Sequence, residues 1–136
     1  MSLIKLDIIQ TQTSQNRQDH AWVDTQSIVA LAQPRYDGKE WTHIYVDAGT
    51  GAKPLVLVSP LEPPALLGHL GSFVGITEVQ LQSGYAPVSW FLRVKAIVAI
   101  TRRPDGKGTV HVRGGMEILV ADPDEVAGRA VSISSL

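Results

Sequence analysis

Two segments of this chain carry the same signals in the same order. An apolar run at 27–31 (Ser-Ile-Val-Ala-Leu) returns at 96–100 (Ala-Ile-Val-Ala-Ile). Asp-Gly-Lys and Ser-Pro-Leu-Glu, at 37–39 and 59–62, return as Asp-Gly-Lys and Asp-Pro-Asp-Glu at 105–107 and 122–125. Repetition of this kind indicates a duplicated structural unit. We therefore expect a pseudo-dimer of two tandem units, the first spanning residues 1–70 and the second residues 71–136.

Composition limits the classes of protein that the chain can belong to. The chain has 136 residues, and half of that length would make a marginal domain, so the two units are expected to pack together. A net charge of -1 argues against a strong electrostatic grip on nucleic acid. The absence of cysteine excludes disulfides and thiolate chemistry. No apolar run is long enough for a membrane span, so we expect a cytoplasmic protein with no membrane association.

The hydrophobic pattern predicts a mostly β fold of the α+β class. Strands are expected at 3–9, 20–23, 27–32, 42–48 and 55–58, and then near 73–82, 87–93, 96–102, 108–113 and 116–120. Ser59, Pro60 and Glu62 predict the capping box of a short helix. Asp122, Pro123 and Glu125 predict the start of a second helix. Each unit should thus contain about five short strands and one C-terminal helix.

Some apolar residues need cover on both faces of their strand. Val29 and Leu31 in the first unit, and Val98 and Ile100 in the second, alternate along strands that are apolar on both sides. The covering layer is either the sister unit or another subunit, so we expect a homo-oligomer. Trp22 and Phe91 fall at matching repeat positions, which predicts core packing for both.

The second unit resembles the FlbD family of small bacterial flagellar-regulatory proteins. The segments that carry the resemblance are Ile97–Ile100, Thr109–Gly115, Ile118–Val120 and Asp122–Val126. The chain departs from that family in being doubled and in its long loops. The resemblance implies a small regulatory or interaction module and not an enzyme. A LytTR-type DNA-binding sheet domain, which has a similar strand order, is the alternative.

The outward face of the strand at 42–48 and of its repeat is one candidate surface. It carries one trio of side chains in each unit: His43, Tyr45 and Asp47, and Thr109, His111 and Arg113. Two trios could face one cleft, or the surface could be an ordinary solvated sheet face. The histidines at 20, 43, 69 and 111 lack ligand spacing, and no serine lies in a nucleophile-elbow context. We therefore expect no catalytic residue, no metal and no cofactor.

Basic residues gather in the second unit. They are Arg93, Lys95, Arg102, Arg103, Lys107 and Arg113. The segment 102–107 reads as a hairpin tip that could hold a phosphate through guanidinium contacts or enter a DNA groove. The alternative is a solubilising edge that prevents strand-to-strand aggregation.

These observations predict a non-enzymatic binding or regulatory protein that acts through an inter-repeat or inter-subunit surface on a protein partner. One alternative is a protein, in a cellular or a viral setting, that sequesters a small anionic, nucleotide-like ligand. The other is a DNA-binding transcriptional regulator, although DNA is not the favoured partner. The residues expected to bind the ligand are Arg102, Arg103, Lys107, His111, Arg113, Tyr45 and His43.

Overall fold

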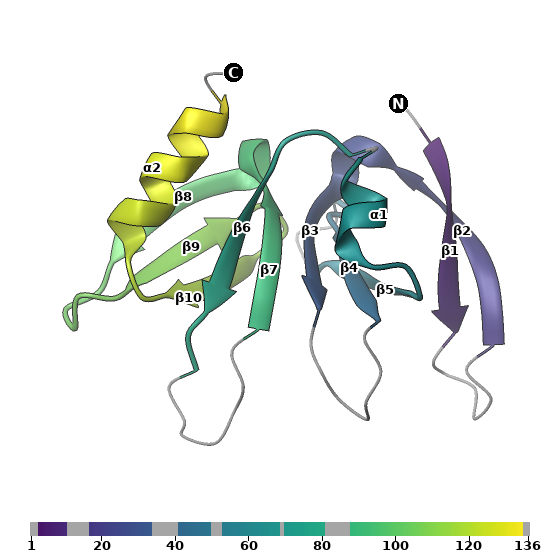
Figure 1. Cartoon of the computed structure of the whole chain (residues 1–136), viewed down its shortest axis with the longest axis horizontal. Coiled ribbons are helices and arrows are strands. Elements are labelled where there is room, and N and C mark those ends of the chain that lie inside the picture. The colour runs from purple at the N-terminus through teal and green to yellow at the C-terminus, as the bar shows by residue number, and fades with distance from the viewer. Residues whose placement is uncertain are drawn as a thin grey trace.

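A computed structural model describes residues 3–10, 17–33, 41–49, 53–68, 70–80 and 88–134. The described residues form ten strands in three antiparallel sheets, with two short 3-10 turns and two α-helices (Figure 1). The α+β, mostly β class predicted from the sequence is confirmed. The Asp-Gly-Lys segment at 37–39 lies outside the described residues.

The first half of the chain begins with a hairpin and ends with a helix. Its elements are β1 (Leu3–Gln10), β2 (Arg17–Asp24), a 3-10 turn η1 (Thr25–Ser27), β3 (Ile28–Gln33), β4 (Thr42–Val46), β5 (Leu55–Ser59) and α1 (Pro63–Leu67).

The second half has the same order of elements. They are β6 (Phe73–Glu78), β7 (Val88–Arg93), η2 (Val94–Ala96), β8 (Ile97–Arg102), β9 (Gly108–Val112), β10 (Met116–Val120) and α2 (Pro123–Ser134). The agreement extends to details. The β3–β4 pairing is interrupted by a register shift at Val29, and the β8–β9 pairing by one at Val98.

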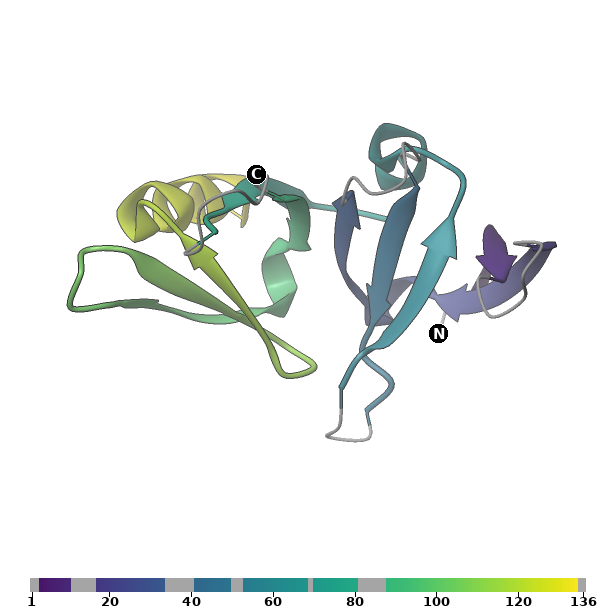
Figure 2. The ribbon, with the colours of Figure 1, turned by 90° about the horizontal axis from the view of Figure 1, so that it is seen from below.

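The two halves are joined through one sheet. The strand order of that sheet is β5-β4-β3-β7-β6, so the β6–β7 hairpin of the second half extends the β3–β4–β5 sheet of the first. The remaining strands form the two-stranded sheet β1-β2 and the three-stranded sheet β10-β9-β8. Figures 1 and 2 place the β1–β2 hairpin at one end of the molecule, and α2 with the three-stranded sheet at the other.

The five-stranded sheet separates two hydrophobic cores. Ile28 and Leu31 of β3 face a core that also contains Leu6, Val23, Ile44, Val46, Leu66 and Leu70. Val29 and Ala30 face a second core that includes Val74, Leu92, Val110, Ile118 and Val126. Every residue from Ile28 to Ala32 is buried, so the prediction of a strand covered on both sides is confirmed for β3.

The two helices start differently. In α2, which begins at Pro123, a carboxylate oxygen of Asp122 accepts from the amide of Glu125 at 3.2 Å, as its sequence predicts. The capping box expected around Ser59 is wrong, since α1 begins at Pro63 and Ser59 Oγ accepts from Leu61 N at 3.2 Å. Two successive prolines need no amide partner, so the helix starts on them.

Several residues expected in the interior lie at the surface. Trp22 is 66% exposed and Val98 is 73% exposed, whereas Val29 at the corresponding place is 0% exposed. Core packing of Trp22 and two-sided cover of β8 are therefore wrong for the single chain. Leu55 and Val56, expected in a buried strand, are exposed because β5 is an edge strand. Within the described ranges, no helix is long and apolar enough to cross a membrane.

Candidate functional site

The turn between β8 and β9 gathers three of the basic residues singled out in the sequence. Arg103 N donates to Lys107 O at 2.7 Å, and Gly106 N donates to Arg103 O at 3.0 Å. Gly106 has φ +87°, a conformation that favours glycine, as the Asp-Gly signal predicts. Arg102, Arg103 and Lys107 consequently lie together at the tip of a two-stranded projection (Figure 1).

Carboxylates accompany the arginines of this turn. Arg102 Nη2 donates to Asp124 at 2.5 Å, and this hydrogen bond raises the pKa of Arg102. Arg103 Nη2 lies 3.4 Å from Asp105, whose other oxygen accepts from Lys107 N at 3.0 Å. Among the described residues, Lys107 makes no ion pair. An incoming phosphate would therefore compete with Asp105 and Asp124 for the two arginines.

His111 is the next-to-last residue of β9 and lies on the outward face of the three-stranded sheet. Its Nε2 is 3.0 Å from Thr101 Oγ1, and its Nδ1 is 3.5 Å from a carboxylate oxygen of Glu117. Both neighbours belong to the adjacent strands β8 and β10. The side chain is thus held within its own sheet, on the same strand as the turn but away from its tip.

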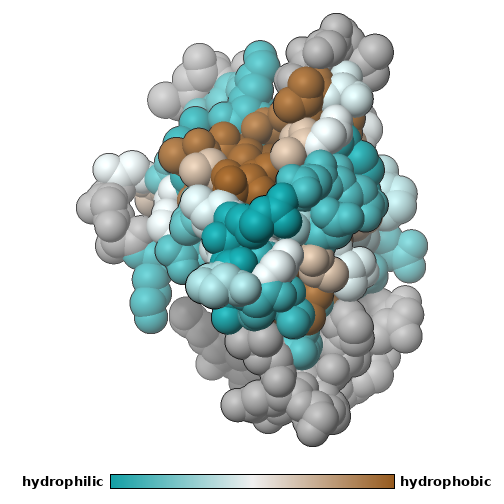
Figure 3. Space-filling model, turned by 90° about the vertical axis from the view of Figure 1, so that its left-hand side faces the viewer, coloured by the Kyte–Doolittle hydropathy of each residue, from teal (hydrophilic) through white to brown (hydrophobic). Residues whose placement is uncertain are grey.

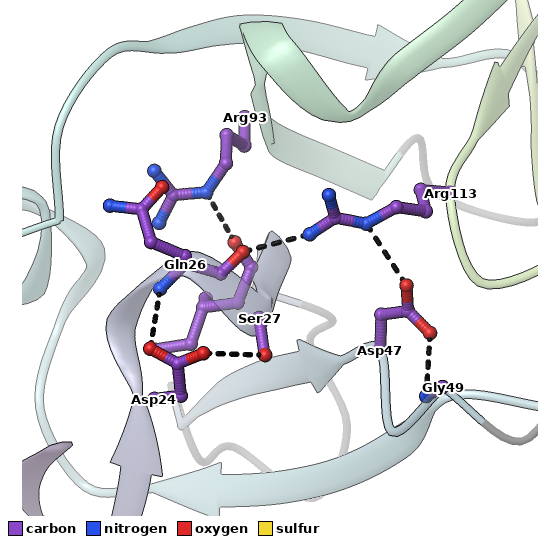
Figure 4. Close-up of polar contacts among 8 residues, drawn as sticks. Asp24, Gln26, Ser27, Asp47, Gly49, Arg93 and Arg113 are labelled. Atoms are coloured by element: carbon purple, nitrogen blue, oxygen red, sulfur yellow. Dashed lines mark hydrogen bonds and ion pairs between the residues drawn. The ribbon is translucent and has the colours of Figure 1, made fainter. Parts of the chain in front are cut away.

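Arg113 follows β9 at the end opposite the turn and contacts the first half of the chain (Figure 4). Its Nε lies 2.9 Å from Asp47, and its Nη2 donates to the carbonyl oxygen of Gln26 at 2.8 Å. The structure therefore separates Arg113 from the basic turn and gives it a place between the halves. Of the two trios predicted on the strand faces, Asp47 and Arg113 are in contact.

Tyr45 and His43 do not lie with the basic turn. The centres of the Tyr45 and Trp90 rings lie 5.0 Å apart, and the ring planes make an angle of 42°. Tyr45 packs against the second core. Burial lowers the pKa of His43, which sits two residues earlier on β4. Both residues belong to the central sheet, so the predicted ligand-binding residues are divided among four places.

Arg93 is a buried polar residue to which the sequence assigned only a place in the basic cluster. It is 5% exposed, and its Nε donates to Ile28 O at 2.7 Å (Figure 4). Its Nη2 donates to Thr25 O at 2.5 Å. The guanidinium also lies 4.8 Å from the centre of the Phe73 ring. Burial, together with the nearby charge of Arg113, lowers the pKa of Arg93. Through these hydrogen bonds, Arg93 connects the end of β7 to η1 and to the first residue of β3.

A cavity of about 300 Å³ opens beside this arginine. Its wall consists of Thr25, Gln26, Leu70, Gly71, Ser72, Arg93 and Lys95. The cavity thus lies at the meeting of the two halves and carries two cationic side chains. Within the described ranges, no three His, Asp or Glu side chains gather closely enough to hold a metal ion.

No family model and no curated protein sequence matches this chain. Among solved structures, a LytTr DNA-binding domain of a response regulator from Bacillus cereus is similar, with a TM-score of 0.55 and 13% sequence identity. The similarity covers 100% of this chain and 99% of that one. The fold is LytTr-like.

The LytTr-like fold agrees with one of the two resemblances found in the sequence. The structural similarity to a LytTr domain extends over the entire chain. The FlbD resemblance, which rested on the second half, finds no support in the comparisons. The LytTr-like fold also places the basic turn on a projecting hairpin, whereas Arg113 and Arg93 lie between the halves.

Proposed function

We propose that this chain is a non-enzymatic regulatory protein that binds duplex DNA. The observation that carries the proposal is the match of the whole chain to the fold of a LytTr DNA-binding domain. This was the second alternative drawn from the sequence, and it is now preferred to a module that binds only proteins.

The β8–β9 turn is the part of the structure best suited to meet DNA. A two-stranded antiparallel ribbon fits the major groove, and arginine side chains form bidentate contacts with guanine or with phosphate. Arg103 and Lys107 lie in the turn of such a ribbon, and Arg103 is held by an ion pair at a relaxed 3.4 Å. Exchange of this carboxylate for a DNA phosphate would cost little, because a partly exposed ion pair contributes little stability.

The charge distribution limits non-specific affinity. The net charge is -1, and Asp105, Asp122 and Asp124 surround the basic turn. With two or three phosphate contacts, the logarithm of the association constant should fall with the logarithm of salt concentration with a slope of about -2 to -3. We therefore expect binding to depend on base sequence more than on total charge.

The test begins with selection of duplexes from a randomised pool, followed by fluorescence anisotropy on the selected DNA. Arg103→Ala combined with Lys107→Ala should weaken binding by about tenfold or more, as expected for loss of direct contacts. The control is Lys53→Ala, which removes an exposed cation from the first half. Failure of the pool to enrich, or equal weakening by the control, would overturn the proposal.

A second candidate function is the binding of a small anion in the cavity beside Arg93. Lys95 and Arg93 supply positive charge to its wall, and Gln26 and Ser72 supply polar groups. A thermal shift with nucleoside phosphates that Lys95→Ala abolishes would support this function. A shift that depends on Arg103 and not on Lys95 would assign the anion to the turn.

A further inference from the structure

The junction of the two halves shows how one half accepts a hairpin from another. β3 pairs with β7 in the register Ala30↔Leu92, Leu31↔Phe91, Ala32↔Trp90 and Gln33↔Ser89. On the side of α1, Phe91 and Phe73 of the donated hairpin pack against the first core. On the opposite side, Val29 packs into the second core and is 0% exposed. Both faces of β3 are covered in this way.

β8 holds the place of β3 in the second half, but no hairpin from the described chain covers it. It is the edge strand of the β10-β9-β8 sheet, and Val98, in the place of Val29, is 73% exposed. Beside it lies an apolar groove lined by Val94, Lys95, Ile97, Ile100, Ala127, Ala130 and Val131. Figure 3, which shows this end of the molecule, displays a patch of hydrophobic side chains there.

The β1–β2 hairpin of the first half corresponds to the β6–β7 hairpin of the second. Its second strand, β2, is an edge strand. Among the described strands, β2 pairs with β1 alone, so its other edge offers backbone groups that no described strand pairs with. Trp22 and Phe91 correspond because each lies three residues before its 3-10 turn. Leu3 and Phe73 correspond because they pair with Asp24 and Arg93, the residues that immediately precede those turns. Trp22 is 66% exposed and Leu3 is 59% exposed. The chain therefore has an acceptor edge at one end and a matching donor hairpin at the other.

We propose that a second copy of this chain adds its β1–β2 hairpin to β8. The internal junction fixes the register as Ala99↔Val23, Ile100↔Trp22, Thr101↔Ala21 and Arg102↔His20. Trp22 then enters the apolar groove under α2, as Phe91 packs on the side of α1. Val98 is covered on the other face, as Val29 is. In this contact, Lys95 at the groove wall of one copy lies near Asp24, which ends β2 of the other copy.

The contact is head-to-tail and cannot close within one chain. Figures 1 and 2 place the β1–β2 hairpin and β8 at opposite ends of the molecule. A heterologous contact of this kind leads to a ring if the rotation closes and to a filament if it does not. Each copy uses two different surfaces, and this property makes the proposal testable.

The test uses the full chain with one surface blocked at a time. Trp22→Asp disables the hairpin, and Val98→Asp disables the acceptor strand. Both side chains are exposed, so the fold should be retained, which circular dichroism verifies. Light scattering coupled to size-exclusion chromatography should give an oligomer for the parent chain and a monomer for each variant. An equimolar mixture of the variants should give a dimer, because one intact donor and one intact acceptor remain.

The control is Leu55→Asp, which places the same charge at an exposed aliphatic residue of β5 and should leave the oligomer unchanged. A monomeric parent chain at high micromolar concentration would overturn the proposal. Two monomeric variants that stay monomeric when mixed would replace it with a symmetric contact. An oligomer that survives both substitutions would show that other surfaces associate. None of these outcomes depends on DNA binding, so the two proposals fail independently.

Discussion

The Nε atom of Arg113 lies 2.9 Å from a carboxylate oxygen of Asp47, and this ion pair joins the end of β9 to the end of β4. The two residues hold corresponding places. Asp47 N donates to Ser27 O and Arg113 N donates to Ala96 O, each at 2.8 Å. Matching backbone positions in the two halves thus carry opposite charges, and those charges meet where the halves pack (Figure 4).

The first prediction concerns this pair. Arg113→Met should lower the free energy of unfolding by about 1 kcal/mol, because the arginine side chain is half exposed and such pairs contribute little. Asp47→Asn serves as the second variant, since its amide oxygen can still accept from Gly49 N. Urea unfolding of both single variants and the double variant gives the coupling energy. Strictly additive losses would show that the contact contributes no stability.

Arg93 should contribute more to the free energy of unfolding than the surface cations do. Arg93→Met keeps much of the aliphatic packing but leaves the carbonyls of Ile28 and Thr25 without their donor. Loss of hydrogen bonds from a buried charged group should lower the free energy of unfolding by about 2–4 kcal/mol. Arg93→Lys should recover part of the loss, because one charged donor remains. A loss no larger than that of Arg113→Met would contradict the interior role.

The order of the strands along the chain could be predicted from the sequence, because each strand has its own local hydrophobic pattern. The alternating and continuous apolar runs found nearly every described strand, and Asp122 with Pro123 marked the start of α2. The pairing of β3 with β7 has no local signal, since it joins residues about sixty positions apart. The exposure of Trp22 could not be predicted either. An aromatic residue in a strand gives the same sequence pattern whether its side chain packs in a core or lies at the surface.

The site was predicted only where one turn defines it. Arg102, Arg103 and Lys107 lie close together because a short hairpin connects them. Arg113 was grouped with them by sequence distance, but β9 carries it to the opposite end of the sheet. Arg93 was read as one member of a surface cluster, and its partners are carbonyl groups that no side-chain motif reveals. A lone arginine that ends the apolar strand Val88–Leu92 was the available signal.

Two glycines should respond to alanine in opposite directions. A Cβ at Gly108 would overlap Pro123, the first residue of α2, and would lie 3.0 Å from Thr101 O. Gly108→Ala should therefore lower the melting temperature, since β9 and α2 would have to separate. Among the described residues, a Cβ added at Gly128 in α2 would meet no atom within 4 Å other than its chain neighbours and the backbone of its own helix, so Gly128→Ala should stabilise by about 0.5–1 kcal/mol. Shifts of the same sign would contradict the packing of α2 on β9.

His43 should make stability dependent on pH. Burial lowers its pKa from 6.5, so the unfolded chain binds a proton more readily than the folded chain. Above about pH 6.5, His43 is neutral in both states and costs the folded state no stability. As the pH falls below this value, the unfolded chain takes up the proton first, so the free energy of unfolding decreases until the pH has passed the lower pKa of the folded state. Between about pH 7.5 and about pH 5.5, His43→Gln should lose less stability than the parent chain in urea titrations. An equal loss in the two proteins would assign the acid sensitivity to other groups.

The last prediction tests the basic turn by increasing its positive charge. Asp105→Asn removes the carboxylate beside Arg103, while the side-chain oxygen can still accept from Lys107 N and keep the turn. If DNA contacts this turn, affinity for a selected duplex should rise about threefold or more, because Arg103 is released and a repulsive charge is gone. Glu62→Gln is the control, since it makes the same change in net charge at an exposed position in the first half. Equal gains in both variants would mean that DNA senses only the total charge, and the contact surface would then lie elsewhere on the LytTr-like fold.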